Sequence, residues 1–307
     1  MKKIIGLLLL LIGIANSVVA TDYEMLTDLG SSAETISLGN VEGMNGSASG
    51  IFENPASLRN VEHTSIGLFM TTLMDEVCYK NISVASRMPV GVIGFGYSEA
   101  SVFNNFNSAE NPITHEFYIK NTFDYRDSMM KLGYSLDLDS DLSIGASYVV
   151  YLRTFGSTKA SGANFDLGVL YTQPTYTLSL FGRNTATGGS VNYEYGDGST
   201  GSEKLPVEMV ASGKCRIIDG TTVYGQMKLR RANPLMSIGA KFIPREFASL
   251  ELNAGYRQYL VANQVKGGLA LGVTVDLLGL KASYSYEKIE DHPQYDNKSY
   301  FSVSVNL

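Results

Sequence analysis

The chain has 307 residues, of which 44% are hydrophobic and 18% charged, and its 30 acidic against 24 basic side chains give a formal net charge of −6. An acidic chain without tracts of basic residues excludes nucleic acid as an expected partner. Two cysteines, Cys78 and Cys215, are too few for a disulfide framework, and we expect them to stay unpaired unless they meet in an oxidising compartment.

Residues 1–20 have the layout of a secretory signal peptide. Lys2 and Lys3 precede an apolar run from Ile4 to Ile14, and small or β-branched residues lead to Ala20. The apolar run is shorter than the roughly 20 residues that a membrane-spanning helix needs. We therefore expect a signal peptide that is cleaved after Ala20, and an exported mature chain.

Residues 21–63 differ from the rest of the chain because they lack period-two alternation and are rich in Gly, Ser, Asn and Ala. We expect them either to be disordered or to pack as a plug inside the β-structure formed by residues 64–307. Asn54-Pro55-Ala56 directly precedes the first expected strand, where proline restricts its own backbone and that of Asn54. This motif is either part of the plug or only a turn that enters the wall. Nearby glycines permit close approach of the backbone. The candidate ligand-binding or gating residues are Gly39, Gly43, Gly46, Gly50, Asn54, Pro55 and Ala56.

From residue 64 onward, apolar and polar residues alternate in segments of about ten residues, the length of a tilted membrane-spanning strand. Phe165, Leu167 and Val169 fall on one face of such a segment. Asp166 and Gly168 fall on the other, because successive side chains of a strand point to opposite faces. The sequence predicts an all-β fold, a transmembrane antiparallel β-barrel of about 14 strands. The expected strands are 64–73, 77–87, 90–99, 126–137, 141–153, 162–172, 175–184, 205–217, 221–231, 235–243, 248–258, 264–275, 279–287 and 298–307.

The connections between these strands give a second indication of a barrel, because short periplasmic turns and longer external loops should alternate. Short links follow the even-numbered strands, for example Met88-Pro89 and Asp139-Ser140. The three longest links, 100–125, 185–204 and 288–297, all follow odd-numbered strands. The sequence therefore predicts that both ends of the barrel domain lie in the periplasm.

The same alternation assigns side chains to the lipid or to the lumen. Val169 and Leu271 should face lipid, whereas the inward positions Gly168 and Ala270 should tolerate serine. A basic lumen attracts anionic ligands by focusing the electric field. The other interpretation, which we favour, is that the charges pair and hydrate a filled interior. The inward basic residues are Lys131, Arg153, Arg183, Lys214, Arg216, Lys228, Arg230, Lys241, Arg257, Lys266 and Lys281. The inward acids are Asp137, Asp166, Glu208, Glu251, Asp276 and Glu287.

Motifs for catalysis are absent from the sequence. It has no phosphate-binding loop, no metal-ligand spacing and no nucleophile elbow, and His63, His115 and His292 have no partner nearby in sequence. A hydrolase whose serine and histidine meet only in space is the remaining enzymatic alternative. We expect no enzymatic activity, no cofactor and no metal site.

Several segments, in order along the chain, resemble one known family. Residues 33–61, which include Asn54-Pro55-Ala56, are similar to its opening. Further similar segments are its second hairpin at 88–96, a central strand at 165–171, a strand entry at 205–207 and its closing strand at 296–305. The chain thus resembles the PorV/PorQ group, within the wider superfamily of FadL-like outer-membrane transporters. The resemblance implies a barrel of about fourteen strands whose N-terminal segment folds into the lumen.

Barrel and resemblance together predict a transport protein of the bacterial outer membrane for small hydrophobic or amphipathic molecules. The alternative is an accessory component of type IX protein secretion that binds exported proteins, as the PorV/PorQ resemblance implies. The expected partners are outer-membrane lipid and a hydrophobic small-molecule ligand. In the alternative, the partner is the secretion machinery or an exported protein.

Overall fold

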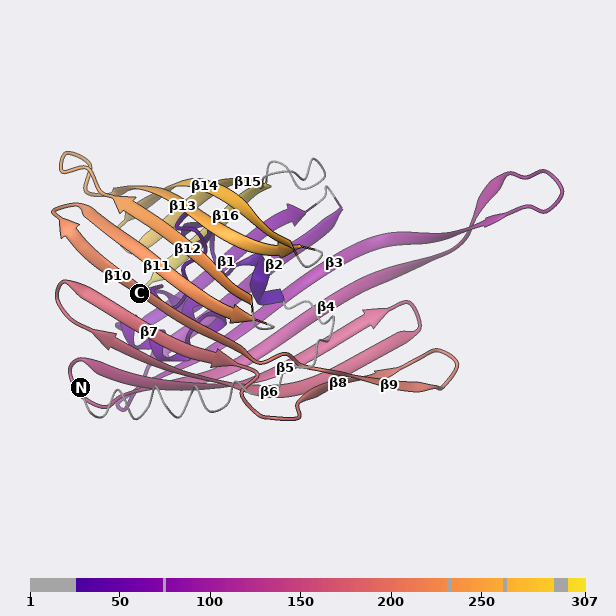
Figure 1. Ribbon diagram of the computed structural model, residues 1–307, viewed down its shortest axis with the longest axis horizontal. Helices are drawn as coiled ribbons and strands as arrows, with labels where there is room; N and C mark the ends of the chain where they lie inside the picture. The colour runs from indigo at the N-terminus through magenta and orange to yellow at the C-terminus, as the bar shows by residue number, and fades with distance from the viewer. Residues whose placement is uncertain (1–25, 74–75, 231–232, 262–263, 290–297) are drawn as a thin grey trace.

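The computed structural model describes residues 26–73, 76–230, 233–261, 264–289 and 298–307, so the expected signal peptide and His292 lie outside the described residues. The chain forms a closed antiparallel β-barrel (Figure 1), and the prediction of an all-β barrel of fourteen strands is confirmed. Strand β16 pairs with β1, for example Val303 with Leu68, so the wall has no free edge. The fourteen strands of the wall are β1 (Thr64–Leu73), β2 (Val77–Arg87), β3 (Val92–Glu110), β4 (Phe117–Asp137), β5 (Leu142–Phe155), β6 (Thr158–Thr172), β7 (Tyr176–Arg183), β10 (Glu208–Ile218), β11 (Thr221–Arg230), β12 (Asn233–Phe242), β13 (Leu250–Val261), β14 (Gln264–Leu277), β15 (Leu280–Ile289) and β16 (Lys298–Asn306).

The outer face of the wall is apolar, as the alternation predicts. In β1, Ile66, Leu68 and Met70 are 41%, 51% and 56% exposed, while the side chains between them point inward. Leu271 is exposed and its neighbour Ala270 is buried. A continuous row of exposed apolar side chains around a closed barrel matches the face that such proteins turn to lipid. Further members of this row are Ile82, Phe95, Leu132, Tyr148, Leu167, Leu178, Met227, Ile238, Leu252, Tyr284 and Phe301.

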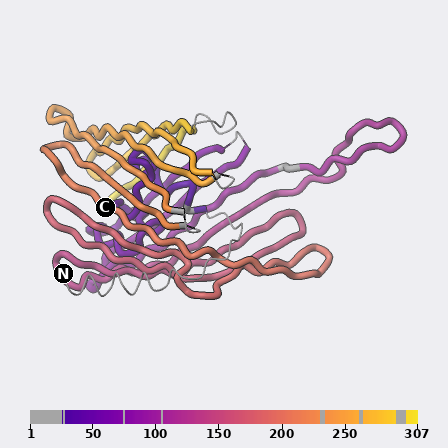
Figure 2. The backbone as a smooth tube through the Cα atoms, in the orientation of Figure 1, coloured from indigo at the N-terminus to yellow at the C-terminus, as the bar shows by residue number. Residues whose placement is uncertain are grey.

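The two ends of the barrel differ in their connections, as Figure 2 shows. At one end the links are tight, for example the turn in which Met88 N–H donates to Gly91 O at 2.9 Å. The C-terminus lies at this end, because Asn306 N–H donates to Gly279 O at 2.8 Å in the turn before β15. By the usual asymmetry of outer-membrane barrels, this is the expected periplasmic end.

Strands β3 and β4 continue far beyond the other end as a two-stranded ribbon (Figure 1), where the sequence predicts only a loop at 100–125. β3 pairs with β2 only as far as Ser101, and β4 pairs with β5 only as far as Tyr125. Beyond these points the two strands pair with each other alone, and we call residues 103–124 the arm. Both faces of the arm are exposed, so neither face selects apolar residues, which is why alternation did not reveal it.

The expected loop at 185–204 also contains strands. β8 (Ser190–Glu194) and β9 (Thr200–Lys204) form a hairpin that pairs with β6 through Val191 and Gly162. This hairpin extends the wall on the same side as the arm (Figure 1).

Residues 26–63, here called the inner segment, lie inside the ring of strands (Figure 1). They form short helical turns: η1 (Leu26–Leu29), α2 (Ala33–Ser37), η2 (Ala48–Phe52) and η3 (Pro55–Asn60). Ser32 caps α2 because its Oγ accepts from Thr35 N–H at 3.1 Å. In the described part of the chain, no helix has the length and apolar character needed to cross a bilayer.

Candidate functional site: the inner segment and the wall around it

The wall is hollowed where Asn54-Pro55-Ala56 lies against it. Gly145 of β5 and Gly168 of β6 are register partners that both face inward. A Cβ on Gly145 would lie 2.7 Å from Ala56 Cα, and one on Gly168 would lie 2.7 Å from Asn54 Cγ. Real side-chain carbons do not approach so closely, so these two glycines form a depression that fits the motif.

Asn54 uses its whole amide group in this depression. Its Oδ1 accepts from Ala56 N–H at 2.9 Å, which caps η3. Its Nδ2 donates to Val169 O at 3.0 Å and to Ser179 Oγ at 2.9 Å. Asn54 is fully buried, so the motif anchors the inner segment to β6 and β7 as well as turning the chain.

A second depression lies on another part of the wall, beneath the end of α2. Gly239 of β12 and Gly255 of β13 are register partners. A Cβ on Gly239 would lie 2.8 Å from Leu38 C, and one on Gly255 would lie 2.8 Å from Gly39 Cα. Gly39 itself has φ +74°, a backbone conformation that other residues rarely adopt. The inner segment is therefore fitted to the wall at two places, on β5–β6 and on β12–β13.

The other candidate glycines have separate roles. Gly43 N–H donates to Glu53 Oε2 at 2.6 Å. Gly50 lies against Ser57 within the segment, and Gly46 has no atom within 4 Å of the place where its Cβ would be. Gly46 borders the cavities described below.

Buried ion pairs join the inner segment to the wall. Arg183, 1% exposed, donates to Glu42 of the inner segment and to Glu208 of the wall, and also to Phe52 O at 3.2 Å. Lys228 Nζ lies 2.7 Å from Glu42 Oε1 and 3.6 Å from Asp28 Oδ1. Removing one partner of such a network leaves an uncompensated buried charge, which is strongly destabilising.

Most of the other inward basic residues that the sequence identified are also paired. The shortest distances in these pairs are 2.6 Å for Lys131 with Asp166, 2.5 Å for Arg153 with Asp127, 2.5 Å for Lys241 with Glu34 and 2.6 Å for Arg257 with Glu287. Lys266 is half-buried, Arg216 is exposed, and the side chain of Arg230 lies outside the described residues. The interpretation of paired charges in a filled interior thus describes the structure better than a free basic lumen.

Sequence reasoning identified Asp166, Glu208, Glu251 and Glu287 among the acids that pair with these residues, but it missed four others. Asp28, Glu34 and Glu42 all belong to the inner segment, and Asp127 lies on β4 just beyond the expected start of that strand's apolar alternation. The signal was present, because acids outnumber basic residues in residues 26–63 while basic residues outnumber acids on the inward wall.

Aromatic side chains of the wall form part of an apolar cluster toward the end of the lumen that carries the arm. Phe69 stacks on Tyr300 with ring centroids 6.1 Å apart and meets Tyr79 edge-on at 5.7 Å. The hydroxyl of Tyr79 donates to Leu26 O at 3.0 Å and to Gly30 O at 3.1 Å. One continuous buried cluster therefore includes wall and inner-segment side chains. Its other members include Ile36, Ile51, Phe52, Leu58, Leu73, Met129, Val149, Tyr151, Val191 and Leu205.

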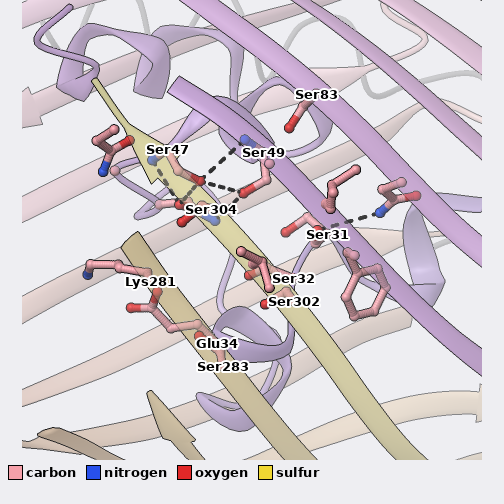
Figure 3. Close-up of a pocket in the computed structure, with 18 residues that line it drawn as sticks. Ser31, Ser32, Glu34, Ser47, Ser49, Ser83, Lys281, Ser283, Ser302 and Ser304 are labelled. Carbon is pink, nitrogen blue, oxygen red and sulfur yellow. Dashed lines mark hydrogen bonds between the residues drawn. The ribbon is translucent and has the colours of Figure 1, made fainter. Parts of the chain in front are cut away.

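Two adjoining cavities border the inner segment and share Glu34, Asn45, Gly46 and Lys281. One, of about 120 Å³, is lined largely by serines (Figure 3). The other, of about 280 Å³, is lined by three lysines on one side. Typical ligand pockets have about 300–1,000 Å³, so both spaces are small.

Other chemical sites are not supported. Among the described residues, no group of three or more His, Cys, Asp and Glu side chains is arranged to hold a metal ion. Cys78 and Cys215 are both free. His115 pairs with Glu110 at 2.6 Å on the exposed tip of the arm.

Comparison with known proteins identifies solved structures that share this fold. No protein-family model and no curated protein matches the chain, so the PorV/PorQ resemblance stays a prediction. The toluene transporter TodX of P. putida superposes with a TM-score of 0.65 at 14% identity, covering 91% of this chain and 99% of TodX. The toluene transporter TbuX of Ralstonia pickettii gives a TM-score of 0.57 at 10% identity, covering 91% and 98%. At these identities the likeness shows that the chain shares the barrel fold of these transporters.

Proposed function

We propose that the chain is an outer-membrane transport protein for small hydrophobic or amphipathic molecules, and that the inner segment gates the passage. The observation that carries this proposal is the apolar cluster around Phe69, Tyr79 and Tyr300 in the half of the lumen nearer the arm. These side chains are buried against the inner segment. A shift of that segment would open them to an apolar solute, whose transfer from water they favour.

The outward apolar row and the fold shared with toluene transporters support this proposal. Location in the outer membrane and cleavage after Ala20 are part of it. The inner segment is held to the wall by fitted depressions, hydrogen bonds and ion pairs. No disulfide links the described parts of the two, so a reversible shift of the segment breaks no covalent bond.

A disulfide that ties the inner segment to the wall tests the gate. A Cβ on Gly67 of β1 would lie 3.8 Å from Ser49 Cβ, which is the mean Cβ separation of about 3.8 Å in disulfides. The variant carries Ser49→Cys and Gly67→Cys, with Cys78 and Cys215 replaced by serine. We expect uptake of an uncharged hydrophobic dye by cells to fall to background when the pair is oxidised and to recover on reduction.

The inner segment also offers a matched control. A Cβ on Gly50 would lie 3.7 Å from Ser57 Cβ, so Gly50→Cys with Ser57→Cys forms a disulfide within the inner segment and leaves the wall free. This control should take up dye in both redox states. Full uptake by the oxidised wall-linked variant would contradict gating by this segment.

The arm favours a second candidate, the docking of an exported protein as an accessory component of type IX secretion. Phe106, Ile113 and Phe117 are 58%, 87% and 76% exposed on the arm. Beyond Ser101 and Tyr125, neither edge of the arm pairs with another strand of the described residues, and unpaired edges accept further strands. Replacing residues 105–122 by an Asn-Gly turn should lower the amount of protein released by the native host without changing dye uptake. Unchanged release would remove this candidate.

A further inference from the structure

The cavity of about 280 Å³ has two unlike sides. Lys214, Lys241 and Lys281 reach it from β10, β12 and β15 near the ends of these strands that carry the tight turns. On the opposite side the inner segment presents Leu38, Val41 and Met44, which form a buried apolar cluster with Tyr224 of β11. The cavity therefore offers positive charge and apolar surface to the same small volume.

The lysines of this cavity differ in their ion pairing. Lys241 Nζ lies 2.5 Å from Glu34 Oε1 and 2.6 Å from Glu251 Oε2, so it is fully paired. Lys281 Nζ lies 3.2 Å from the other oxygen of Glu251 and 3.8 Å from Asp276. For Lys214, no carboxylate of the described residues lies within ion-pair distance, although its side chain is largely shielded from solvent. Among the described residues that line this cavity, Lys214 is thus the lysine without a direct ion-pair partner.

We propose that this cavity binds a compact organic anion, a carboxylate with a small apolar body. The carboxylate pairs with Lys214, and this charge-assisted contact is favoured because the site is shielded from water. The apolar body packs against the cluster that Leu38, Val41 and Met44 form with Tyr224. A volume of about 280 Å³ admits a single aromatic ring or a short chain and excludes long-chain amphiphiles. The lining of this site does not include Phe69, Tyr79 or Tyr300, and binding to it does not depend on transport.

Equilibrium binding to the full-length protein in uncharged maltoside micelles tests the proposal. The probes are benzoate and benzyl alcohol, which share a ring and differ in charge, and the readouts are saturation-transfer NMR and calorimetric titration. We expect saturable binding of benzoate and at least tenfold weaker binding of benzyl alcohol. Lys214→Gln should weaken benzoate binding at least tenfold, and Lys214→Arg should retain it.

Two controls complete the test. Lys120→Gln removes an exposed lysine of the arm and should leave benzoate binding unchanged, and the heat-modifiable mobility of every variant on gels reports whether its barrel is folded. Val41→Asp should abolish benzoate binding, because it places a carboxylate on the apolar side of the cavity. Equal binding to the parent protein and to folded Lys214→Gln would overturn the proposal. Displacement of benzoate by equimolar inorganic phosphate would also overturn it, since the site would then recognise charge alone.

Discussion

At the scale of single residues, the inner segment fits closely against glycines of the wall. The clearest case is Gly145, whose missing side chain makes room for the backbone of Ala56. The carbonyl oxygen of Ala56 in turn accepts from Ser135 Oγ at 3.1 Å and from Ser143 Oγ at 3.2 Å. A side chain at Gly145 would therefore break hydrogen bonds as well as fill space.

Gly145→Val should displace the inner segment while the wall still closes, because the strand pairing uses backbone groups. Overpacking of this kind costs about 1–3 kcal/mol, visible as a lower urea midpoint, and the displaced segment should become sensitive to protease. Gly225→Val is the matched control, because a Cβ there meets no atom within 4 Å. Equal protease resistance in both variants would show that the fit at Gly145 does not hold the segment.

Glu53 gives the inner segment a dependence on pH. Its carboxylate is buried, and it accepts hydrogen bonds from Ser31 and, at 3.0 Å, from Thr35. Burial raises the pKa of Glu53, the nearby Glu42 carboxylate adds to this, and the hydrogen bonds only partly offset it. A raised folded pKa means that the stabilisation is complete below the unfolded pKa and is lost as pH rises through the folded value.

Protease resistance of the inner segment should therefore fall as pH rises from mildly acidic values. Glu53→Gln imitates the protonated form, so this variant should stay resistant over the same range. The nearby charges of Glu42 and Arg183 remain in both proteins, so they do not account for a difference between them. A pH profile that is the same in both would assign the effect to another group.

Gly168 shows why part of the site could not be predicted from the sequence. Alternation correctly turns it inward, but the expectation that it tolerates serine is wrong, because Asn54 already occupies the space. The two residues lie far apart in the chain, and their contact exists only after the barrel closes around the inner segment. The glycines and Asn54-Pro55-Ala56 were identified from the sequence, but their partners could not be.

At the scale of elements, the strands of the wall could be predicted because each alternates between an outward apolar face and an inward face. Leu271 in β14 is 63% exposed on that face, while the adjacent Ala270 is 1% exposed. The arm and the β8–β9 hairpin lie beyond the wall, where neither face is selected, and the sequence predicted loops there. Period-two alternation therefore identified the strands whose two faces have different surroundings, and it missed the strands whose faces are alike.

Leu271→Arg should destabilise the folded barrel by about 2–4 kcal/mol in lipid, because it puts a charge on the lipid face near the midplane. The free energy of unfolding in phospholipid vesicles measures the effect. Ile113→Arg on the tip of the arm is the control, since that side chain is 87% exposed beyond the wall and should change stability little. Equal effects of the two substitutions would mean that β14 does not turn Leu271 to lipid.

At the scale of the whole molecule, tight turns and long hairpins are segregated to opposite ends. Ser199 lies in the turn between β8 and β9, and Asp219 lies in the tight turn between β10 and β11. Both turns are exposed, so a difference in their reactivity on cells reports the side of the membrane rather than burial.

With Cys78 and Cys215 replaced by serine, Ser199→Cys should react with an impermeant maleimide on intact cells. Asp219→Cys should react only after the outer membrane is opened. The reverse pattern would mean that the barrel has the opposite orientation in the membrane, with the arm in the periplasm.

The acidic character of the inner segment has a consequence for any open state. Residues 26–63 carry five acidic side chains and one arginine. Glu34 pairs with Lys241 of the wall, and Glu42 pairs with Lys228 and Arg183. Withdrawal of the segment would remove these counter-charges and leave Glu208 and Glu251 to balance the three cations. The pore would then prefer chloride to potassium, whereas an uncharged hydrocarbon would meet no electrostatic difference. The reversal potential across a salt gradient is therefore a direct signature of where the segment lies.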